Sequence, residues 1–182
     1  MSVVLNGKTL LTYSDFVHFP EDGQRHELIG GEHYVTPSPN TRHQRISIAL
    51  EVQLYRQIKE AGLGEVFDAP MDLVLSPSDV VEPDLIVVLN SNRRIITPKN
   101  IQGAPDLVVE ITSPSTEKRD RELKLSLYQA HAVPEYWIVR CDQDCVDQHL
   151  LENGVYRLVG TFRDALTFHG LDGVTVDLAK VW

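Results

Sequence analysis

The chain has 182 residues, a formal net charge of -9, 42% hydrophobic and 24% charged residues. These values are typical of one globular domain, residues 1–182, and no run approaches the roughly 18 uninterrupted apolar residues of a membrane span. The acidic charge disfavours constitutive tight binding to nucleic acid, because such binding depends on a basic surface. It weighs less against a nuclease, whose acidic metal site adds negative charge until cations occupy it. Because no secretion signal opens the sequence, we expect a cytoplasmic protein without a membrane partner.

The N-terminal part predicts a hairpin between two helices. A short helix is expected over residues 14–18, and the paired glycines of HELIGGEHYVT, residues 26–36, predict a β-hairpin. A longer helix is expected over residues 42–60, where Thr41 and Gln44 match a capping box. Its core face is an apolar stripe at four-residue spacing, formed by Ile46, Leu50, Leu54 and Ile58.

The central part predicts strands that are covered on both faces. Residues 65–75 are expected to form two short strands separated by Pro70. The segments VVEPDLIVVL, residues 80–89, and DLVVEIT, residues 106–112, are almost continuously apolar, as strands buried on both faces are. A helix is expected to follow over residues 116–130.

The C-terminal part predicts further strands. PEYWIV, residues 134–139, is expected to be another buried strand, and turns are predicted at Asn153-Gly154 and Asp172-Gly173. The remaining residues are therefore expected to form antiparallel strands that close the sheet. The order of elements predicts an α/β (α+β) fold in which a mixed β-sheet is flanked by helices.

A carboxylate interrupts each of the two central apolar strands, Asp84 in the first and Glu110 in the second. An ionised carboxylate there costs several kcal/mol unless a cation or hydrogen bonds compensate it. If the strands are neighbours, the pair predicts a shared divalent cation such as Mg²⁺ or Mn²⁺, with the carbonyl of Ile111 as a third ligand. Taken singly, each carboxylate is better explained by a structural ion pair with a buried Lys or Arg. Pro83 favours a bend or a sheet edge at Asp84, where a site could open.

Lys124 lies on the helix that follows the Glu110 strand. Asp120 precedes it by four residues and shares its helix face, so the two could form a surface ion pair worth about 0.3–0.5 kcal/mol. Alternatively, Lys124 leans over the end of the Glu110 strand toward the metal site. His43, in the first turn of the long helix, could contact the site or a phosphate, or could be a solvated residue.

Several stretches resemble the Uma family of restriction-endonuclease-like proteins, a branch of the PD-(D/E)XK phosphodiesterase superfamily. They are, in order, HELIGGEHYV, RHQRIS, VVEPDLIVV, IQGAPDLVVEITSPST, DRELKLSLYQAHAVPEYWIV and ENGVYRLV. Together they span about residues 26–159, most of the chain. The resemblance implies a restriction-endonuclease-like fold, a mixed β-sheet flanked by helices.

The resemblance also assigns site residues by position. Asp84 matches the aspartate of the "PD" half-motif, Glu110 the acidic residue of the second half, and Glu32 a hairpin glutamate that can complete the metal site. Lys124 matches a lysine on the following helix, and the match includes His43. The sequence departs from the superfamily pattern two residues after the acid, where Thr112 stands in place of the usual lysine. Catalysis is therefore expected to depend on whether Lys124 reaches the site.

The function implied is a metal-dependent endonuclease that hydrolyses phosphodiester bonds of nucleic acid, with DNA as the expected substrate, by means of a metal-activated water. We expect a homodimer, because two active sites would be needed to cut both strands of a duplex. The alternative is a catalytically inactive protein with the nuclease fold that acts as a regulatory or binding module. A serine hydrolase that uses Ser113 or Ser115 is disfavoured, because no Gly-x-Ser-x-Gly elbow is present.

Overall fold

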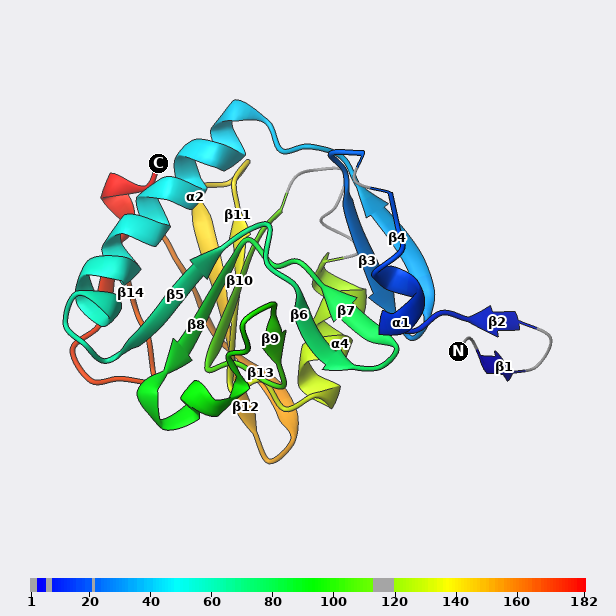
Figure 1. Ribbon diagram of the computed structural model, residues 1–182. Helices are drawn as coiled ribbons and strands as arrows, with labels where there is room; N and C mark the ends of the chain where they lie inside the picture. Colours follow the sequence, from blue (N-terminus) through cyan, green and yellow to red (C-terminus); the bar gives the residue numbers. More distant parts are fainter. Residues whose placement is uncertain (1–2, 6–7, 21, 113–119) are drawn as a thin grey trace.

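A six-stranded sheet forms the centre of the computed structural model, in the order β13-β12-β11-β10-β8-β5 (Figure 1). The structure describes residues 3–5, 8–20, 22–112 and 120–182. Strands β10 and β11 run parallel and the other four neighbouring pairs run antiparallel, so the sheet is mixed. The strands are β5 (Gly64–Asp68), β8 (Leu85–Leu89), β10 (Leu107–Thr112), β11 (Glu135–Arg140), β12 (Cys145–Glu152) and β13 (Val155–Phe162).

A second, five-stranded sheet has the order β4-β3-β7-β6-β9. Its strands are β3 (Arg25–Ile29), β4 (Glu32–Thr36), β6 (Leu73–Ser76), β7 (Asp79–Val81) and β9 (Ile101–Gln102). The single strand predicted over residues 80–89 is wrong, because the chain leaves β7 in this sheet and enters β8 in the other. Pro83, which has no N–H to donate to a ladder, lies at this crossing. Its neighbour Asp84 therefore stands where the two sheets meet.

The long helix predicted over residues 42–60 is confirmed as α2 (Thr41–Leu54) followed by a π-helical turn, η1 (Tyr55–Lys59). The predicted capping box at Thr41 is wrong. The N-cap is Asn40, whose side chain accepts a hydrogen bond from the backbone N–H of His43 at 2.9 Å. The helix after the Glu110 strand consists of a π-helical turn, η3 (Asp120–Lys124), and α4 (Leu125–Ala130). Its expected start at residue 116 lies outside the described residues.

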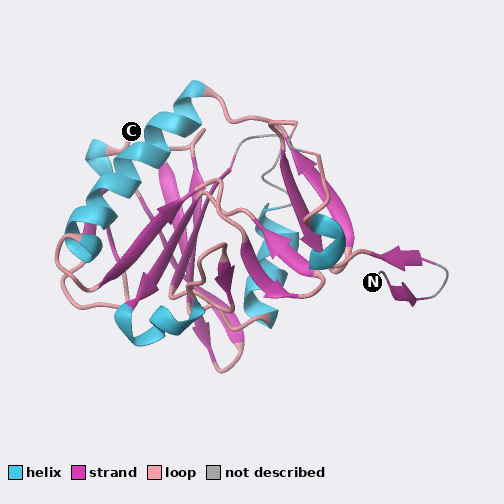
Figure 2. Ribbon diagram, in the orientation of Figure 1, coloured by secondary structure: helices cyan, strands magenta, loops and turns pink. Residues whose placement is uncertain are grey.

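Strands β8 and β10 are buried because helices and strands cover both faces of the six-stranded sheet (Figure 2). One core cluster joins α2 and η1 to that sheet and includes Ile46, Leu50, Leu54, Ile58, Leu85, Val87 and Val109. The other joins α4 and the five-stranded sheet to the opposite face and includes Leu73, Ile86, Val88, Val108, Leu127 and Tyr128. Successive strand residues alternate between the two clusters, which explains the continuous apolar runs in the sequence.

The remaining elements are short. They are β1 (Val3–Leu5), β2 (Lys8–Leu10), α1 (Tyr13–Phe16), the 3-10 helix η2 (Asn90–Ile95), β14 (Ala165–Thr167), β15 (Thr175–Asp177) and the 3-10 helix η4 (Leu178–Lys180). The predicted turn at Asn153-Gly154 is confirmed, since both residues have a positive φ and connect β12 to β13. None of the helices in the described ranges combines the length and the apolar character that a membrane crossing needs.

Candidate active site at the junction of the two sheets

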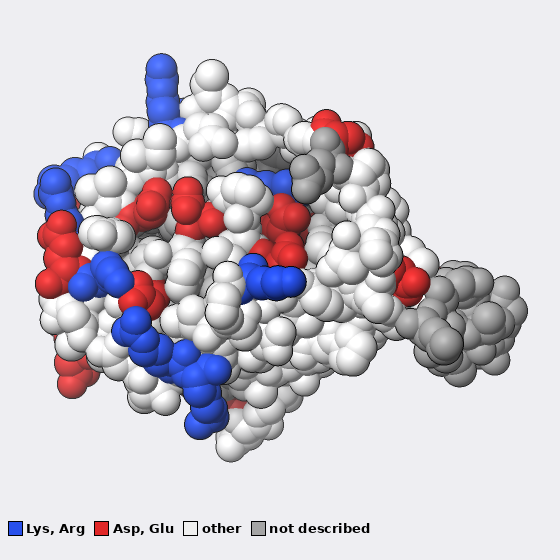
Figure 3. Space-filling view, in the orientation of Figure 1, with Lys and Arg blue, Asp and Glu red and all other residues white. Residues whose placement is uncertain are grey.

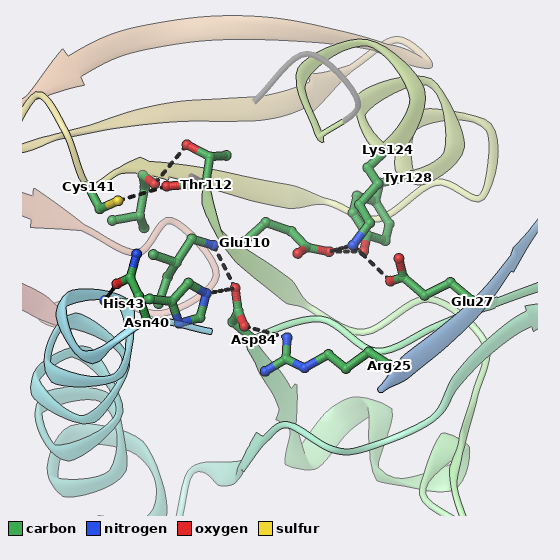
Figure 4. A network of polar contacts seen from close by, with 12 residues as sticks. Arg25, Glu27, Asn40, His43, Asp84, Glu110, Thr112, Lys124, Tyr128 and Cys141 are labelled. Atoms are coloured by element: carbon green, nitrogen blue, oxygen red, sulfur yellow. Dashed lines mark hydrogen bonds and ion pairs between the residues drawn. The ribbon is translucent and has the colours of Figure 1, made fainter. Parts of the chain in front are cut away.

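Asp84 lies in the connection between β7 and β8, with 3% of its side chain exposed. Its Oδ1 accepts a hydrogen bond from Nη1 of Arg25 at 2.7 Å (Figure 4). Its Oδ2 accepts one from the backbone N–H of Ile111 at 2.8 Å and lies 3.1 Å from Nε2 of His43. Burial would raise the pKa of Asp84, but the hydrogen bond and charge of His43 and the charge of Arg25 outweigh it and hold the pKa below its usual value. The carboxylate is therefore ionised and is held from β3, α2 and β10.

Glu110 follows Val109, the last residue of β10 that pairs with β8, and Val109 stands across from Leu85, the residue after Asp84. Its Oε1 accepts two hydrogen bonds of 2.7 Å, from Nζ of Lys124 and from the hydroxyl of Tyr128. These two donors are four residues apart and so share a face of the helix formed by η3 and α4. Burial, followed by the charge of Glu110, raises the pKa of Tyr128 well above its usual value. The phenol therefore stays protonated and donates to the glutamate.

Lys124 joins the two sheets through carboxylates on both sides. Its Nζ lies 2.7 Å from Oε1 of Glu110 in β10 and 2.8 Å from Oε1 of Glu27 in β3, while only 3% of the lysine side chain is exposed. The same oxygen of Glu27 accepts a hydrogen bond from the backbone N–H of Glu82 at 3.2 Å. A buried ammonium is stable only when it is paired in this way, and removal of one partner typically costs about 3–5 kcal/mol. The arrangement fixes the lysine beside Asp84 and Glu110.

Arg25 and Glu27 are two residues apart on β3 and therefore project from the same face of that strand. Burial lowers the pKa of the Arg25 guanidinium, but the charges of Asp84, Glu110 and Glu82 raise it by more. The pKa therefore lies above its usual value, and the group stays charged. The Arg25 side chain is 21% exposed, compared with 3% for its partner Asp84. Of the two cations described in this cluster, Arg25 is therefore more accessible to solvent than Lys124, whose side chain is 3% exposed.

Carboxylates gather in this cluster. Asp84, Glu110 and Glu27 are buried, and the described contacts pair them with Arg25 and Lys124. A fourth carboxylate lies close by. Burial, then the charges of Asp72 and Glu27, raise the pKa of Glu82 to about 7. The shift shows that neighbouring carboxylates repel Glu82, and a cation bound nearby would relieve this repulsion.

The expected ligand Glu32 lies elsewhere on the hairpin. Its side chain is exposed on β4, and its Oε2 accepts a hydrogen bond from the hydroxyl of Tyr34 at 3.3 Å. Glu27, on the other strand of the hairpin, is the glutamate that contacts Lys124. The carbonyl of Ile111 as a metal ligand stays a prediction, since the described contact of this residue with the site is the N–H bond to Asp84.

Thr112 stands where the resemblance noted in the sequence would lead one to expect a lysine. Its Oγ1 donates to the carbonyl of Val139 at 3.3 Å, and its own carbonyl accepts from Sγ of Cys141 at 2.9 Å. Thr112 is thus part of the sheet's own bonding, and the lysine of the cluster comes from η3. The side chain of Asp120 and the residues Ser113 and Ser115 lie outside the described part of the chain, so the predicted ion pair with Lys124 is not tested.

Sequence reasoning missed three members of the cluster, namely Arg25, Glu27 and Tyr128. Tyr128 could have been found from its spacing, because it follows Lys124 by one helical turn and so lies on the same helix face. The spacing of Arg25 and Glu27 is weaker evidence, since it shows only that they alternate along a predicted strand of the hairpin. Neither pattern shows that the five-stranded sheet packs this face of β3 against Asp84 and Lys124.

The oxygen donors of Asp84 and Glu110 suit a hard divalent cation such as Mg²⁺. In the described part of the chain, however, no group of three or more His, Cys, Asp or Glu side chains is arranged to hold a metal ion. Asp84 accepts from Arg25 and Glu110 accepts from Lys124 instead. The oxygen donors therefore fit a metal, which would have to displace a cation of the chain, and of the two described here Arg25 is the more exposed.

All the residues of this cluster fall within the part of the chain that matches a family model. The Uma2 model, described as "Putative restriction endonuclease", matches residues 13–179. The chain belongs to the Uma2 family. The family resemblance noted in the sequence is thereby confirmed, and the cluster lies within the matched range of this Uma2 protein.

The fold of this Uma2 protein is similar to that of a solved structure described as a "putative nuclease belonging to DUF820" from Anabaena variabilis ATCC 29413. The two share 19% sequence identity at a TM-score of 0.75, over 94% of this chain and 97% of the other. The likeness confirms the predicted mixed α+β nuclease fold with its flanking helices. No curated protein matches the chain.

Proposed function

We propose that this Uma2 protein is a Mg²⁺- or Mn²⁺-dependent endonuclease that hydrolyses phosphodiester bonds of nucleic acid, with DNA as the substrate. The family and the fold support a nuclease. The observation that carries the proposal is the position of Lys124, whose Nζ lies 2.7 Å from Glu110 although no lysine stands at position 112. An acid pair and a lysine, the groups that this chemistry requires, are thus gathered at one place.

Each residue has a distinct role in this proposal. Asp84 and Glu110, with the carbonyl of Ile111, would hold the metal ion. When bound, the ion would supply Lewis acidity, which lowers the pKa of a water molecule and offsets charge on the phosphate. Lys124 orients the attacking water and stabilises negative charge that develops on the phosphate. Glu27 is a positioning residue that holds Lys124 from β3.

The proposal also covers His43, Glu32 and the oligomeric state of the protein. His43 contacts Asp84 through Nε2 and orients that carboxylate, since Asn40 fixes the first turn of α2. Glu32, whose carboxylate is exposed on β4, stays a prediction as an additional ligand for a second ion. We also propose a homodimer, which would bring two such sites to the two strands of a duplex.

One observation favours the second candidate, a catalytically inactive regulatory or binding module. Both acids are already neutralised by cations of the chain, Asp84 by Arg25 and Glu110 by Lys124. An ion pair of this kind can stabilise a fold without any metal. The two candidates differ in one property, because a module of this kind would take up no divalent cation at Asp84.

Calorimetric titration of Mg²⁺ and Mn²⁺, beside cleavage assays on plasmid and single-stranded DNA, tests the proposal. The proteins are the wild type, Asp84→Asn and the control Asp172→Asn, which removes an exposed carboxylate near the C-terminus. We expect metal binding and cleavage by the wild type and the control, and neither by Asp84→Asn. Equal metal binding by Asp84→Asn would refute the assigned ligand, and a wild type that binds no metal would favour the module.

A further inference from the structure

The acidic composition overstates the negative charge of the surface. Among the described residues, six acidic side chains are buried and only one basic side chain is, so five of the nine net negative charges lie inside. The buried acids are Glu27, Asp79, Asp84, Glu110, Glu135 and Asp147, and the buried base is Lys124. The surface that a partner meets is therefore less acidic than the sequence indicates, and local basic regions on it can act.

One such region, here named the basic ridge, consists of Arg56 and Lys59 on η1 and Arg93 and Arg94 on η2. Figure 3 shows Lys and Arg side chains gathered over this part of the molecule, at the lower left. Glu65 of β5 joins the two elements, because it forms ion pairs with Lys59 and, at 3.2 Å, with Arg93. The Arg93 side chain is nevertheless 64% exposed, so its guanidinium can still reach a partner.

The basic ridge and Asp84 lie at opposite ends of the same pair of strands. β5 pairs antiparallel with β8, with Gly64 across from Leu89 at the ridge and Asp68 across from Leu85, the residue after Asp84. Four strand steps separate these ends, or about 13 Å at about 3.3 Å per residue. This length corresponds to about four nucleotides at about 3.4 Å per nucleotide of one strand in a duplex.

Charge is segregated along β5. Its first half carries Glu65 with the cations of the basic ridge, whereas its last residue is Asp68. A second carboxyl group, Glu51 on α2, lies near Asp68, because burial, followed by the charge of Asp68, raises the pKa of Glu51. A polyanion is therefore attracted at the ridge end and is tolerated at the Asp84 end only where cations neutralise the carboxylates.

We propose that the basic ridge binds the sugar-phosphate backbone of the nucleic acid substrate, about four nucleotides from the bond that is cut. The inference rests on the proposed function, because it takes the cut bond to lie at Asp84. The ridge supplies the affinity that the acidic catalytic end lacks, and β5 sets the distance between the two. Binding at the ridge is independent of sequence, since phosphates carry no base identity.

Fluorescence anisotropy with a labelled 24-base-pair DNA duplex, in EDTA and over a series of salt concentrations, tests the ridge without cleavage. The variant Arg93→Gln/Arg94→Gln is compared with the wild type and with Arg157→Gln/Lys180→Gln. The control loses the same charge at exposed positions on β13 and η4. We expect the ridge variant to bind about tenfold more weakly, with a slope of log K against log salt that is shallower by about one per arginine.

The control is expected to bind as the wild type does. Equal affinity and slope for the ridge variant and the wild type would overturn the inference, and so would a wild type that does not bind the duplex. The outcome is separate from that of the proposed function, since a protein that binds through the ridge but never cleaves would refute only the latter. With a cleaving enzyme, duplexes that extend fewer than about four base pairs on the ridge side should be cut more slowly.

Discussion

Nζ of Lys124 lies 2.7 Å from Oε1 of Glu110, although the lysine belongs to η3 and the glutamate to β10. The helix that contains η3 and α4 packs on the sheet face toward which Glu110 points, and Tyr128 one turn later binds the same oxygen. The sequence has no lysine at position 112, and the lysine of the cluster comes from a neighbouring element.

Tyr128→Phe removes the hydrogen bond from the hydroxyl to Glu110 and keeps the aromatic ring in the core. We expect a loss of about 1–2 kcal/mol in the free energy of unfolding, because the bond has an ionised acceptor. Urea unfolding measures this loss. Tyr156→Phe is the control, since the hydroxyl of Tyr156 donates to a backbone carbonyl of Val133. Both variants should be less stable than the wild type, but only Tyr128→Phe should also slow cleavage. If the two variants slowed cleavage equally, Tyr128 would have no specific role in holding Glu110.

Arg25→Gln should raise the affinity for Mg²⁺ or Mn²⁺. The guanidinium occupies Oδ1 of Asp84, so a metal ion must displace it, and a hydrogen bond between charged groups is worth about 1.5–3 kcal/mol. Calorimetry should therefore show a dissociation constant lower by about tenfold, or about 1.4 kcal/mol. Arg42→Gln is the control, because Arg42 pairs with Asp144 and not with Asp84. Weaker metal binding in Arg25→Gln would mean that the arginine supports the site and does not compete for it.

The raised pKa of Glu82 predicts that the metal-free protein becomes less stable as the pH rises. Its pKa is raised from 4.5 to about 7 in the folded protein, chiefly by burial. Between these values the folded state binds more protons than the unfolded state, so the contribution of Glu82 to stability falls as pH rises through this window. Glu82→Gln should therefore unfold at a higher temperature than the wild type at pH 8, and this difference in unfolding temperature should shrink at pH 5.

Thermal unfolding at both pH values in EDTA measures the difference. The control is Glu122→Gln, which changes an exposed residue. An advantage that is the same at pH 5 and pH 8 would show that Glu82 is not the group responsible.

The sequence alone drew attention to the two acids, because each interrupts an apolar segment. Asp84 and Glu110 stand out in apolar strands, and both are buried. The family resemblance then singled out Lys124 among the charged residues of its helix. The continuous apolar runs also predicted strands covered on both faces, which β8 and β10 are.

The partners of these residues could not be predicted, because they depend on how the two sheets pack. Residues 80–89 look like one strand in the sequence, yet the chain changes sheets at Pro83. That change brings β3 against the site, and with it Arg25 and Glu27. Local patterns specify which face of β3 these residues share, but not which element covers that face.

Metal-dependent nicking of a supercoiled plasmid by the wild type, Lys124→Gln and Lys180→Gln is the most direct test of the site. Lys124→Gln keeps hydrogen-bond donors for Glu27 and Glu110, and Lys180 is an exposed control, with 74% of its side chain accessible. Calorimetry and circular dichroism establish that each protein binds metal and is folded. We predict that Lys124→Gln binds Mg²⁺ but cleaves at least about 100-fold more slowly, as expected for the loss of a group that stabilises charge in the transition state. Cleavage by folded Lys124→Gln at the wild-type rate would contradict the account and remove Lys124 from the mechanism.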